Sequence, residues 1–224
     1  MHVEILYRPA HALARVVLAP YESVTAESGA LVGMSPNLKL ETQSGGLLSG
    51  VKRFFGGESF FRNTFTAPAE RGEVLLAHAL CGDLRVLDLT QAGFFLQSSA
   101  FVAATPNVQV ETALGGLRNF FSGAGLFVLR VTAASPGLLV FGAFGGIEEL
   151  VCDGNLVIDT GHLVAWDATL DYTIGKSASG WLMSFLSGEG LVCRFRGQGR
   201  IWIQSRSPSA YGRKVGSLLP PRKG

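Results

Sequence analysis

Short apolar stretches, several with polar residues at alternate positions, run through the chain between glycine-rich turns. Alternation over about four to eight residues predicts half-buried strands. The pattern predicts strands over 60–65, 84–89, 126–132, 191–196 and 201–205. Long helical patterns are scarce, so we expect an all-β fold of antiparallel strands, a sandwich or wrapped barrel with few short helices. Trp202, in the last of these strands, is expected to pack in the core.

A hairpin is predicted at Asp153-Gly154. Two apolar runs, 150–152 and 156–158, flank this pair of residues. Asp-Gly favours the left-handed backbone conformations of a two-residue turn. We therefore expect the chain to reverse direction here and to form two short paired strands.

Three stretches of the chain look like variants of one stretch, and they begin at Ser28, Ser98 and Thr160. A glycine-bounded apolar segment follows each of them, at 45–58, 115–123 and 179–189. Landmarks that recur in the same order predict a repeated structural unit. We predict a single β domain over 1–205 made of three repeats that share a core, at about 3–68, 72–132 and 137–205.

The remaining segment, 206–224, is basic and contains prolines, among them Pro220 and Pro221. Terminal segments of this composition are usually solvated and poorly ordered. We expect that state here, with contact to an anionic or membrane surface as the alternative.

The glycine-bounded segments carry large apolar side chains where a connection is expected. The candidate interface residues are Phe54, Phe55, Phe120, Phe121, Trp181 and Phe185. Such residues plug a core or contact another subunit, or they form a tip that binds a membrane or a partner. Arg53 and Arg118, beside the aromatic residues, keep the membrane interpretation open.

Glu58 and Glu189 occupy the same place in the first and third glycine-bounded segments, where the second has Ala124. A carboxylate after a small residue and a glycine can accept hydrogen bonds from the backbone of a turn. The functional alternative is a pair of carboxylates that faces a ligand or a pore. Glu58 and Glu189 are therefore the candidate ligand or pore residues.

Composition limits the class of protein. Hydrophobic residues make up 47% of the 224-residue chain, charged residues only 16%, and the mean hydropathy is +0.30. No apolar run approaches the roughly 20 residues of a membrane-spanning helix. Burial between subunits is the expected place for the excess apolar surface, which predicts a homo-oligomer. The net charge of +2 lacks the concentrated basic face of a nucleic-acid-binding protein.

The sequence favours a cytoplasmic protein. The amino terminus lacks the charged region and the continuous apolar region of a signal peptide. Three widely spaced cysteines, Cys81, Cys152 and Cys193, are expected to be reduced thiols.

Motifs for catalysis are weak, and we expect neither an enzyme nor a cofactor. Asp159-Thr160-Gly161 follows two apolar residues, as in aspartic proteases; the first repeat has Glu27-Ser28-Gly29 there, which favours a hydrogen-bonded turn. Gly175-Lys176-Ser177 resembles the end of a phosphate-binding loop, but Leu170 stands where that loop needs glycine. The four histidines are scattered, so no metal site is expected.

The chain resembles the altered inheritance of mitochondria protein 24 family. The residues that carry the resemblance are 26–32, 54–61 and 187–192, and it extends from about Val3 to Ser205. It implies a duplicated β fold similar to the tryptophan RNA-binding attenuation protein, a homo-oligomer with a trimer as the expected state, and no established catalytic residues. Mitochondrial members are associated with inner-membrane organisation. That role does not carry over directly, because the chain lacks a transit peptide.

Three functions remain open at this point. The first is a non-enzymatic, homo-oligomeric β scaffold that contacts a partner or a membrane surface through the glycine-bounded segments. The second is a ring that binds RNA or a small ligand, by analogy with the attenuation protein. It needs a rim of Lys and Arg repeated in all three units, which the sequence lacks, so we do not expect nucleic acid as a partner. The third is an enzyme that uses Asp159 or the pair Glu58 and Glu189.

Overall fold

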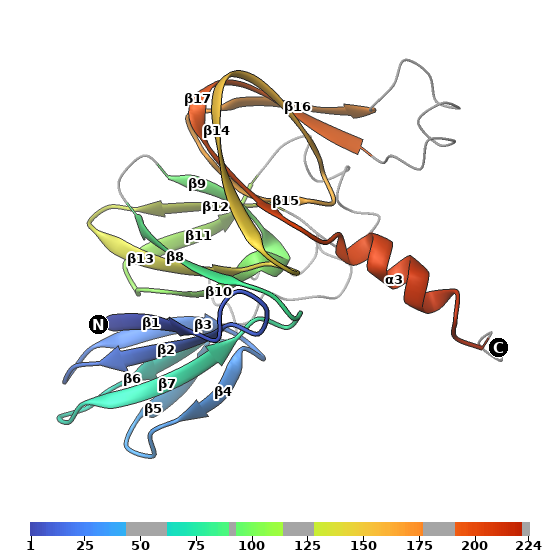
Figure 1. The fold of residues 1–224 in the computed structure, drawn as a ribbon. Coiled ribbons are helices and arrows are strands. Elements are labelled where there is room, and N and C mark those ends of the chain that lie inside the picture. The colour runs from blue at the N-terminus through green and yellow to red at the C-terminus, as the bar shows by residue number, and fades with distance from the viewer. Residues whose placement is uncertain (44–61, 90–92, 114–127, 177–190, 221–224) are drawn as a thin grey trace.

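The structure is a computed structural model, and it describes residues 1–43, 62–89, 93–113, 128–176 and 191–220. Antiparallel strands make up almost all of the regular secondary structure in the described chain, and they form three sheets. Figure 1 shows the amino-terminal strands, drawn in blue to cyan, at the lower end of the molecule and the last strands, drawn in orange and red, at the upper end. The prediction of an all-β, antiparallel fold with few short helices is confirmed.

The strands of each sheet are given in the order in which they pair. The first sheet contains β1 (His2–Leu6), β2 (Leu13–Leu18), β7 (Gly72–Ala77) and β4 (Leu31–Met34). The second contains β5 (Lys39–Gln43), β6 (Arg62–Thr66), β3 (Ser23–Glu27), β10 (Phe101–Ala104), β13 (Gly137–Gly142) and β8 (Leu84–Leu89). The third contains β11 (Val108–Thr112), β12 (Val128–Ala133), β9 (Phe94–Gln97), β15 (Leu163–Asp167), β17 (Leu191–Gln204) and β14 (Ile147–Asp159), and β16 (Asp171–Lys176) pairs with β17. The helices among the described residues are a 3-10 turn, η1 (Ser98–Ala100), and α3 (Pro208–Gly216).

The outer halves of β14 and β17 leave the third sheet and curl over it with β16 (Figure 1). We call this layer the arch and define it as 155–159, 171–176 and 191–196. The stack therefore has four layers, and an apolar core lies between each pair of neighbouring layers. The core between the third sheet and the arch includes Trp166, Phe195 and Ile201.

Strands β10 and β15 are buried at every apolar position because both faces of their sheets are covered. Their sequences, Phe101–Ala104 and Leu163–Trp166, are unbroken apolar runs. An unbroken run is typical of a strand that is buried on both faces, whereas alternation is typical of one solvated face. Trp202, only 1% exposed, packs in the core as predicted, with its ring edge against Phe94 and Phe141.

The predicted hairpin at Asp153-Gly154 is wrong. Strand β14 runs without a break through these residues and pairs with β17 along its whole length, from Ile147 to Asp159. Gly154 lies directly opposite Gly197, and both have a positive φ, +110° and +105°. Because glycine tolerates these angles, the two strands bend together and keep their hydrogen-bonded ladder. The Asp-Gly pair therefore marks the bend into the arch.

The expectation that the tail is poorly ordered is wrong for Pro208–Gly216, which forms helix α3. The hydroxyl of Ser207 caps the helix by accepting a hydrogen bond from the Ala210 N–H (3.3 Å). Pro208, at the first helical position, removes an N–H group that would have no partner there. The ring of Tyr211 packs edge-on against Phe144 at 5.1 Å, and no residue of the helix is buried.

Four antiparallel pairings recur in the same order along the chain. In the first set of strands, β2 to β7, they are β2 with β7, β7 with β4, β3 with β6, and β6 with β5. The second set, β8 to β13, repeats them as β8 with β13, β13 with β10, β9 with β12, and β12 with β11. In the third set, β14 to β17, the two halves of β14 and β17 make the equivalent pairs together with β15 and β16.

A register shift also falls at one matching place in each set. It lies at Leu31 in β4, at Phe101 in β10 and at Leu163 in β15. The recurring pairings and shifts support the predicted triplication, which stays a prediction.

Candidate interaction surfaces

The candidate residues from the sequence all fall outside the described residues. They are Phe54, Phe55, Glu58, Phe120, Phe121, Trp181, Phe185 and Glu189. The segments that carry them connect β5 to β6, β11 to β12, and β16 to β17. Each of these connections joins the two strands of one antiparallel pair, at the same place in each set. The proposed roles of these residues stay predictions.

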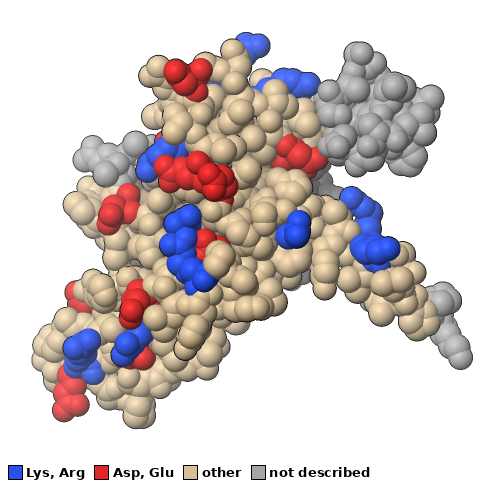
Figure 2. Space-filling model, viewed as in Figure 1, with Lys and Arg blue, Asp and Glu red and all other residues tan. Residues whose placement is uncertain are grey.

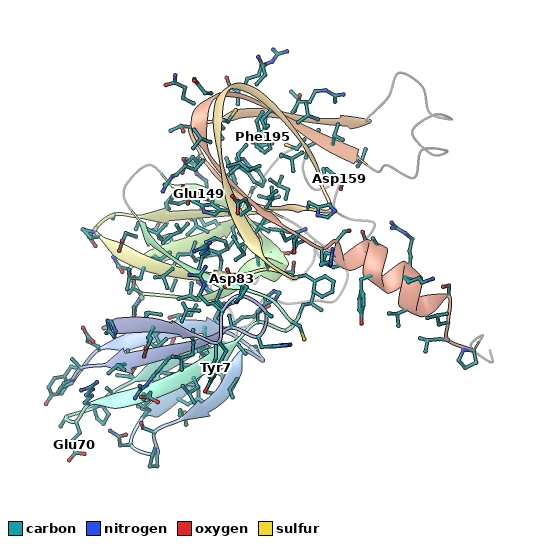
Figure 3. The ribbon with its side chains drawn as sticks, viewed as in Figure 1. Tyr7, Glu70, Asp83, Glu149, Asp159 and Phe195 are labelled. Carbon is teal, nitrogen blue, oxygen red and sulfur yellow. The ribbon has the colours of Figure 1, made fainter. Side chains whose placement is uncertain are left out.

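Asp159-Thr160-Gly161 forms the turn between β14 and β15. The Asp159 carboxylate accepts a hydrogen bond from the Gly161 N–H (Oδ1 to N, 2.6 Å), and the Thr160 hydroxyl donates to the Leu191 carbonyl (2.9 Å). Figure 3 shows Asp159 at this end of β14. The carboxylate therefore holds its own turn, as in an Asx turn, which agrees with the structural interpretation of the motif.

The other sequence motifs are also part of the architecture. Gly175 lies in the extended strand β16 opposite Val192, so it does not belong to a phosphate-binding loop. His78 donates from Nε2 to the Ser99 carbonyl, and His162 donates from Nδ1 to the Gln204 carbonyl, each at 2.8 Å. Within the described residues, no group of three or more His, Cys, Asp or Glu could hold a metal ion.

Asp83 is a buried carboxylate at the start of β8, with a relative exposure of 1%. Arg8 binds it with two parallel hydrogen bonds, Nε to Oδ1 at 2.8 Å and Nη2 to Oδ2 at 2.9 Å. The Leu84 N–H donates to Oδ1 (2.9 Å), and Arg85 Nε lies 3.9 Å from Oδ2. The hydrogen bond to Asp83 raises the pKa of Arg8. Figure 3 shows Asp83 where the loop after β1 meets the second sheet, so this cluster ties the two together.

Charged groups of the third sheet are likewise bound to neighbours. The Asp167 carboxylate accepts from the backbone N–H of Arg200 (2.7 Å) and from its guanidinium (3.2 Å). That guanidinium stacks over the ring of Trp202, whose Nε1 donates to Glu149 (2.9 Å). These contacts hold β15, β17 and β14 in register.

Strand β4 presents apolar side chains at the edge of the first sheet. Val32 is 59% exposed, whereas Val102 of β10 and Val164 of β15, at the matching positions, are both 0% exposed. Leu31 and Met34 are exposed as well. Among the described strands, only β7 pairs with β4. The sequence analysis missed this surface, although aligning the repeats would have identified the valine positions.

The end of strand β14 presents a second apolar edge, in the arch. Val157 is 57% exposed, and Leu156 and Ile158 are half-buried against the core beneath the arch. Within the described chain, residues 155–159 pair with β17 on one side and with no strand on the other. Strands β4 and β14 therefore end the sheet stack with one apolar edge each.

Charges of both signs are interspersed on the face of the molecule in Figure 2, with basic side chains also along α3. The described part of that face shows no continuous basic surface of the kind that tracks a nucleic-acid backbone. No helix in the described ranges is long and apolar enough to cross a membrane.

Comparison with known proteins adds the family to this geometry. The family model described as Mitochondrial biogenesis AIM24 matches residues 3–206. This chain belongs to the AIM24 family. The resemblance predicted from residues 26–32, 54–61 and 187–192 is thereby confirmed.

Two relatives of the AIM24-family chain are bacterial. An uncharacterized protein of Streptococcus pyogenes serotype M6 is 32% identical over 209 residues, which cover 88% of this chain and 83% of the relative. The crystal structure of a Streptococcus pyogenes protein is similar with a TM-score of 0.80 and 29% identity, covering 97% of this chain and 99% of that one. The fold is thus shared over nearly the whole length of both proteins.

Proposed function

We propose that this AIM24-family protein is a non-enzymatic, self-associating β scaffold. In this proposal it binds a partner protein or a membrane surface through the glycine-bounded segments. The observation that carries the proposal is the apolar strand edge at each end of the stack, formed by β4 and by residues 155–159 of β14. Exposed edge strands of this kind pair with other chains unless something covers them.

The polar contacts support a non-enzymatic role. Asp159 is the described residue that the sequence made a candidate for chemistry, and its carboxylate is engaged in a hydrogen bond that shapes the fold. The side chains of His78 and His162 likewise donate hydrogen bonds to backbone carbonyls. A catalytic acid or base instead has to reach a proton on a substrate.

The three glycine-bounded segments support the binding role. They connect equivalent strand pairs, β5–β6, β11–β12 and β16–β17. All three segments carry aromatic residues, and in two of them these residues form a Phe-Phe pair. A repeated scaffold that carries one kind of loop can bind with several loops at once, which raises its apparent affinity.

We further propose a cytoplasmic location and a trimer. The location is supported by the thiols of Cys81, Cys152 and Cys193, none of which forms a disulfide. Burial raises the pKa of Cys193 to about 12, so its thiol is protonated and unreactive at neutral pH. The trimer rests on the family resemblance.

The first test is the mass in solution, measured by size-exclusion chromatography with light scattering at micromolar concentration. We expect a multiple of the 23.8 kDa chain mass, with three copies as the specific expectation. A monomer would contradict the scaffold.

The second test is flotation with vesicles that contain anionic lipid. A variant with Phe54→Ser and Phe55→Ser should lose binding to the vesicles if the segment contacts a membrane. Tyr21→Ser is the matched control, because Tyr21 is an aromatic residue that is 79% exposed outside these segments. No flotation of the wild type would leave the partner protein as the binding target, and equal loss in the control would count against the segments.

A further inference from the structure

The strand sets are joined to one another by one kind of pairing, which occurs twice inside the chain. Strand β3 of the first set pairs antiparallel with β10 of the second, and β9 of the second set pairs with β15 of the third. The register is the same in both cases at matching positions: Ala26 lies opposite Ala103, and Leu96 lies opposite Ala165. This pairing fuses two half-sheets into the second and third sheets.

The series is incomplete at both ends. The strand that corresponds to β3 and β9 in the third set is the end of β14, residues 155–159, because it pairs with the first half of β17 as β9 pairs with β12. The strand that corresponds to β10 and β15 in the first set is β4, which carries the matching register shift. In the part of the chain that the structure describes, neither edge makes the joining pair.

A single copy cannot pair these two edges with each other. Figure 1 shows β4 in the lowest layer and the arch at the opposite end of the stack. Among the described strands of one copy, none is left to pair with either edge, which favours a partner strand from another molecule. A second copy of this chain offers the same complementary strand that β10 and β15 find within the chain.

We propose that β4 of one copy pairs antiparallel with residues 155–159 of β14 in a second copy. The internal pairs set the register, with Gly33 opposite Ile158 and Met34 opposite Val157. The result is one continuous sheet in the order β16-β17-β14-β4-β7-β2-β1. This inference rests on the proposed self-association and specifies the interface that produces it.

The same pairing explains the exposure of Val32. Val102 lies in the core of the first strand set and Val164 in the core of the second, so each valine enters the core of the set before its own. By the same rule, Val32 of one copy enters the core beneath the arch of the other, next to Leu156 and Phe195. Val32 is 59% exposed in one copy, so burying its apolar side chain favours the contact.

The composition of the edge agrees with pairing. Solvated edge strands usually carry a lysine or another charged residue, or a proline, and these residues prevent association. Strand β4, Leu31–Met34, carries none of these. Because the two edges differ, the contact is heterologous, and it closes into a ring or continues as a filament according to the rotation between copies. The expected trimer requires a ring.

Cysteine cross-linking tests the register directly. One protein carries Met34→Cys and another carries Val157→Cys, both with Cys81→Ser to remove the exposed native thiol. The Cα atoms of residues directly opposite in antiparallel strands are about 4.5–5.5 Å apart, within reach of a disulfide. Mild oxidation of the mixture should therefore give a linked dimer, and each protein alone should not.

The matched control replaces Val157→Cys by Val151→Cys. Val151 is also an exposed valine of β14, but it lies opposite Arg200, outside the proposed pairing. Linking to Val151 as readily as to Val157 would overturn the register. An oligomer by light scattering without a Met34–Val157 link would overturn this interface while the proposed scaffold stands, and a monomer would overturn both.

A charge exchange gives a second readout in the intact protein. Val157→Asp or Met34→Lys alone should dissociate the oligomer to a mass of one chain, because each places a charge opposite an apolar residue at the new interface. The double variant places opposite charges face to face and should restore the oligomer. Failure of the double variant to reassemble, with both single variants folded by circular dichroism, would contradict the proposed opposition of these residues.

Discussion

Replacing Arg8 by alanine should destabilise the protein far more than replacing Arg15, although both guanidinium groups bind a carboxylate at close range. Arg8 binds Asp83 (Nε to Oδ1, 2.8 Å), and Arg15 binds Glu73 (Nε to Oε2, 2.7 Å). The difference is burial of the acid: the side chain of Asp83 is 2% exposed, and that of Glu73 is 34% exposed.

The loss of unfolding free energy in Arg8→Ala depends on the contacts that the Asp83 carboxylate retains in the variant. Removing one partner of a buried ion pair costs about 3–5 kcal/mol, because a charge is left without compensation in a region of low dielectric. Here the side chain of Arg8 is itself 38% exposed, and Asp83 retains the Leu84 N–H and Arg85 at 3.9 Å. These contacts reduce the expected loss of unfolding free energy to about 2–3 kcal/mol. Arg15→Ala should cost only a small fraction of that loss, because water already solvates the charges of both Arg15 and Glu73.

Urea unfolding of the wild type and both variants measures the difference, from the transition midpoint at constant m-value. A loss of about 2–3 kcal/mol should lower the midpoint of thermal unfolding by about 4–12 °C for a chain of this size. Asp83→Asn combined with Arg8→Ala should recover part of the loss, because the buried group is then neutral. Equal destabilisation by Arg8→Ala and Arg15→Ala would refute the argument from burial.

Two further predictions concern single residues. Burial raises the pKa of Glu27 to about 7, above the roughly 4.3 of an unfolded chain, so its stabilising contribution is present at low pH and is lost as pH rises through about 7. Between pH 5 and pH 8 the wild type should therefore lose stability relative to Glu27→Gln in urea unfolding, and parallel pH profiles would contradict this. Gly154→Ala should cost about 1–2 kcal/mol by the same assay, because its φ is +110° although no atom within 4 Å would meet the new Cβ. Gly212→Ala in exposed helix α3, with equal space and no positive φ, is the control and should cost nothing.

Alternation of apolar and polar residues predicted the strands well where no turn signal interrupted it. The alternation at 84–89 corresponds to β8, Leu84–Leu89, and the two predicted strands at 191–196 and 201–205 lie in the single long strand β17. The Asp153-Gly154 turn failed because a residue distant in sequence, Gly197, faces Gly154 and lets both strands bend without separating. A turn signal read from neighbouring residues contains no information about Gly197, which is distant in sequence.

Helix α3 could have been predicted and was missed. Ser207 followed by Pro208 is a helix start signal, an N-cap hydroxyl before a proline at the first helical position. The basic composition of the tail and its later prolines outweighed this signal in the sequence analysis. The apolar edges of β4 and β14 are a different case, because their exposure depends on which strands meet in three dimensions.

The sequence by itself determined the β class, the positions of several strands and the family, because these depend on local alternation and on motifs that recur in order. Only the tertiary structure decided which apolar strands are covered. Val32, Val102 and Val164 are the same residue at matching places, and two of them are buried while Val32 is 59% exposed. The physical reason is position in the stack: an inner strand has a neighbouring layer that buries its side chains, whereas β4 lies in the last layer and pairs with β7 alone among the described strands.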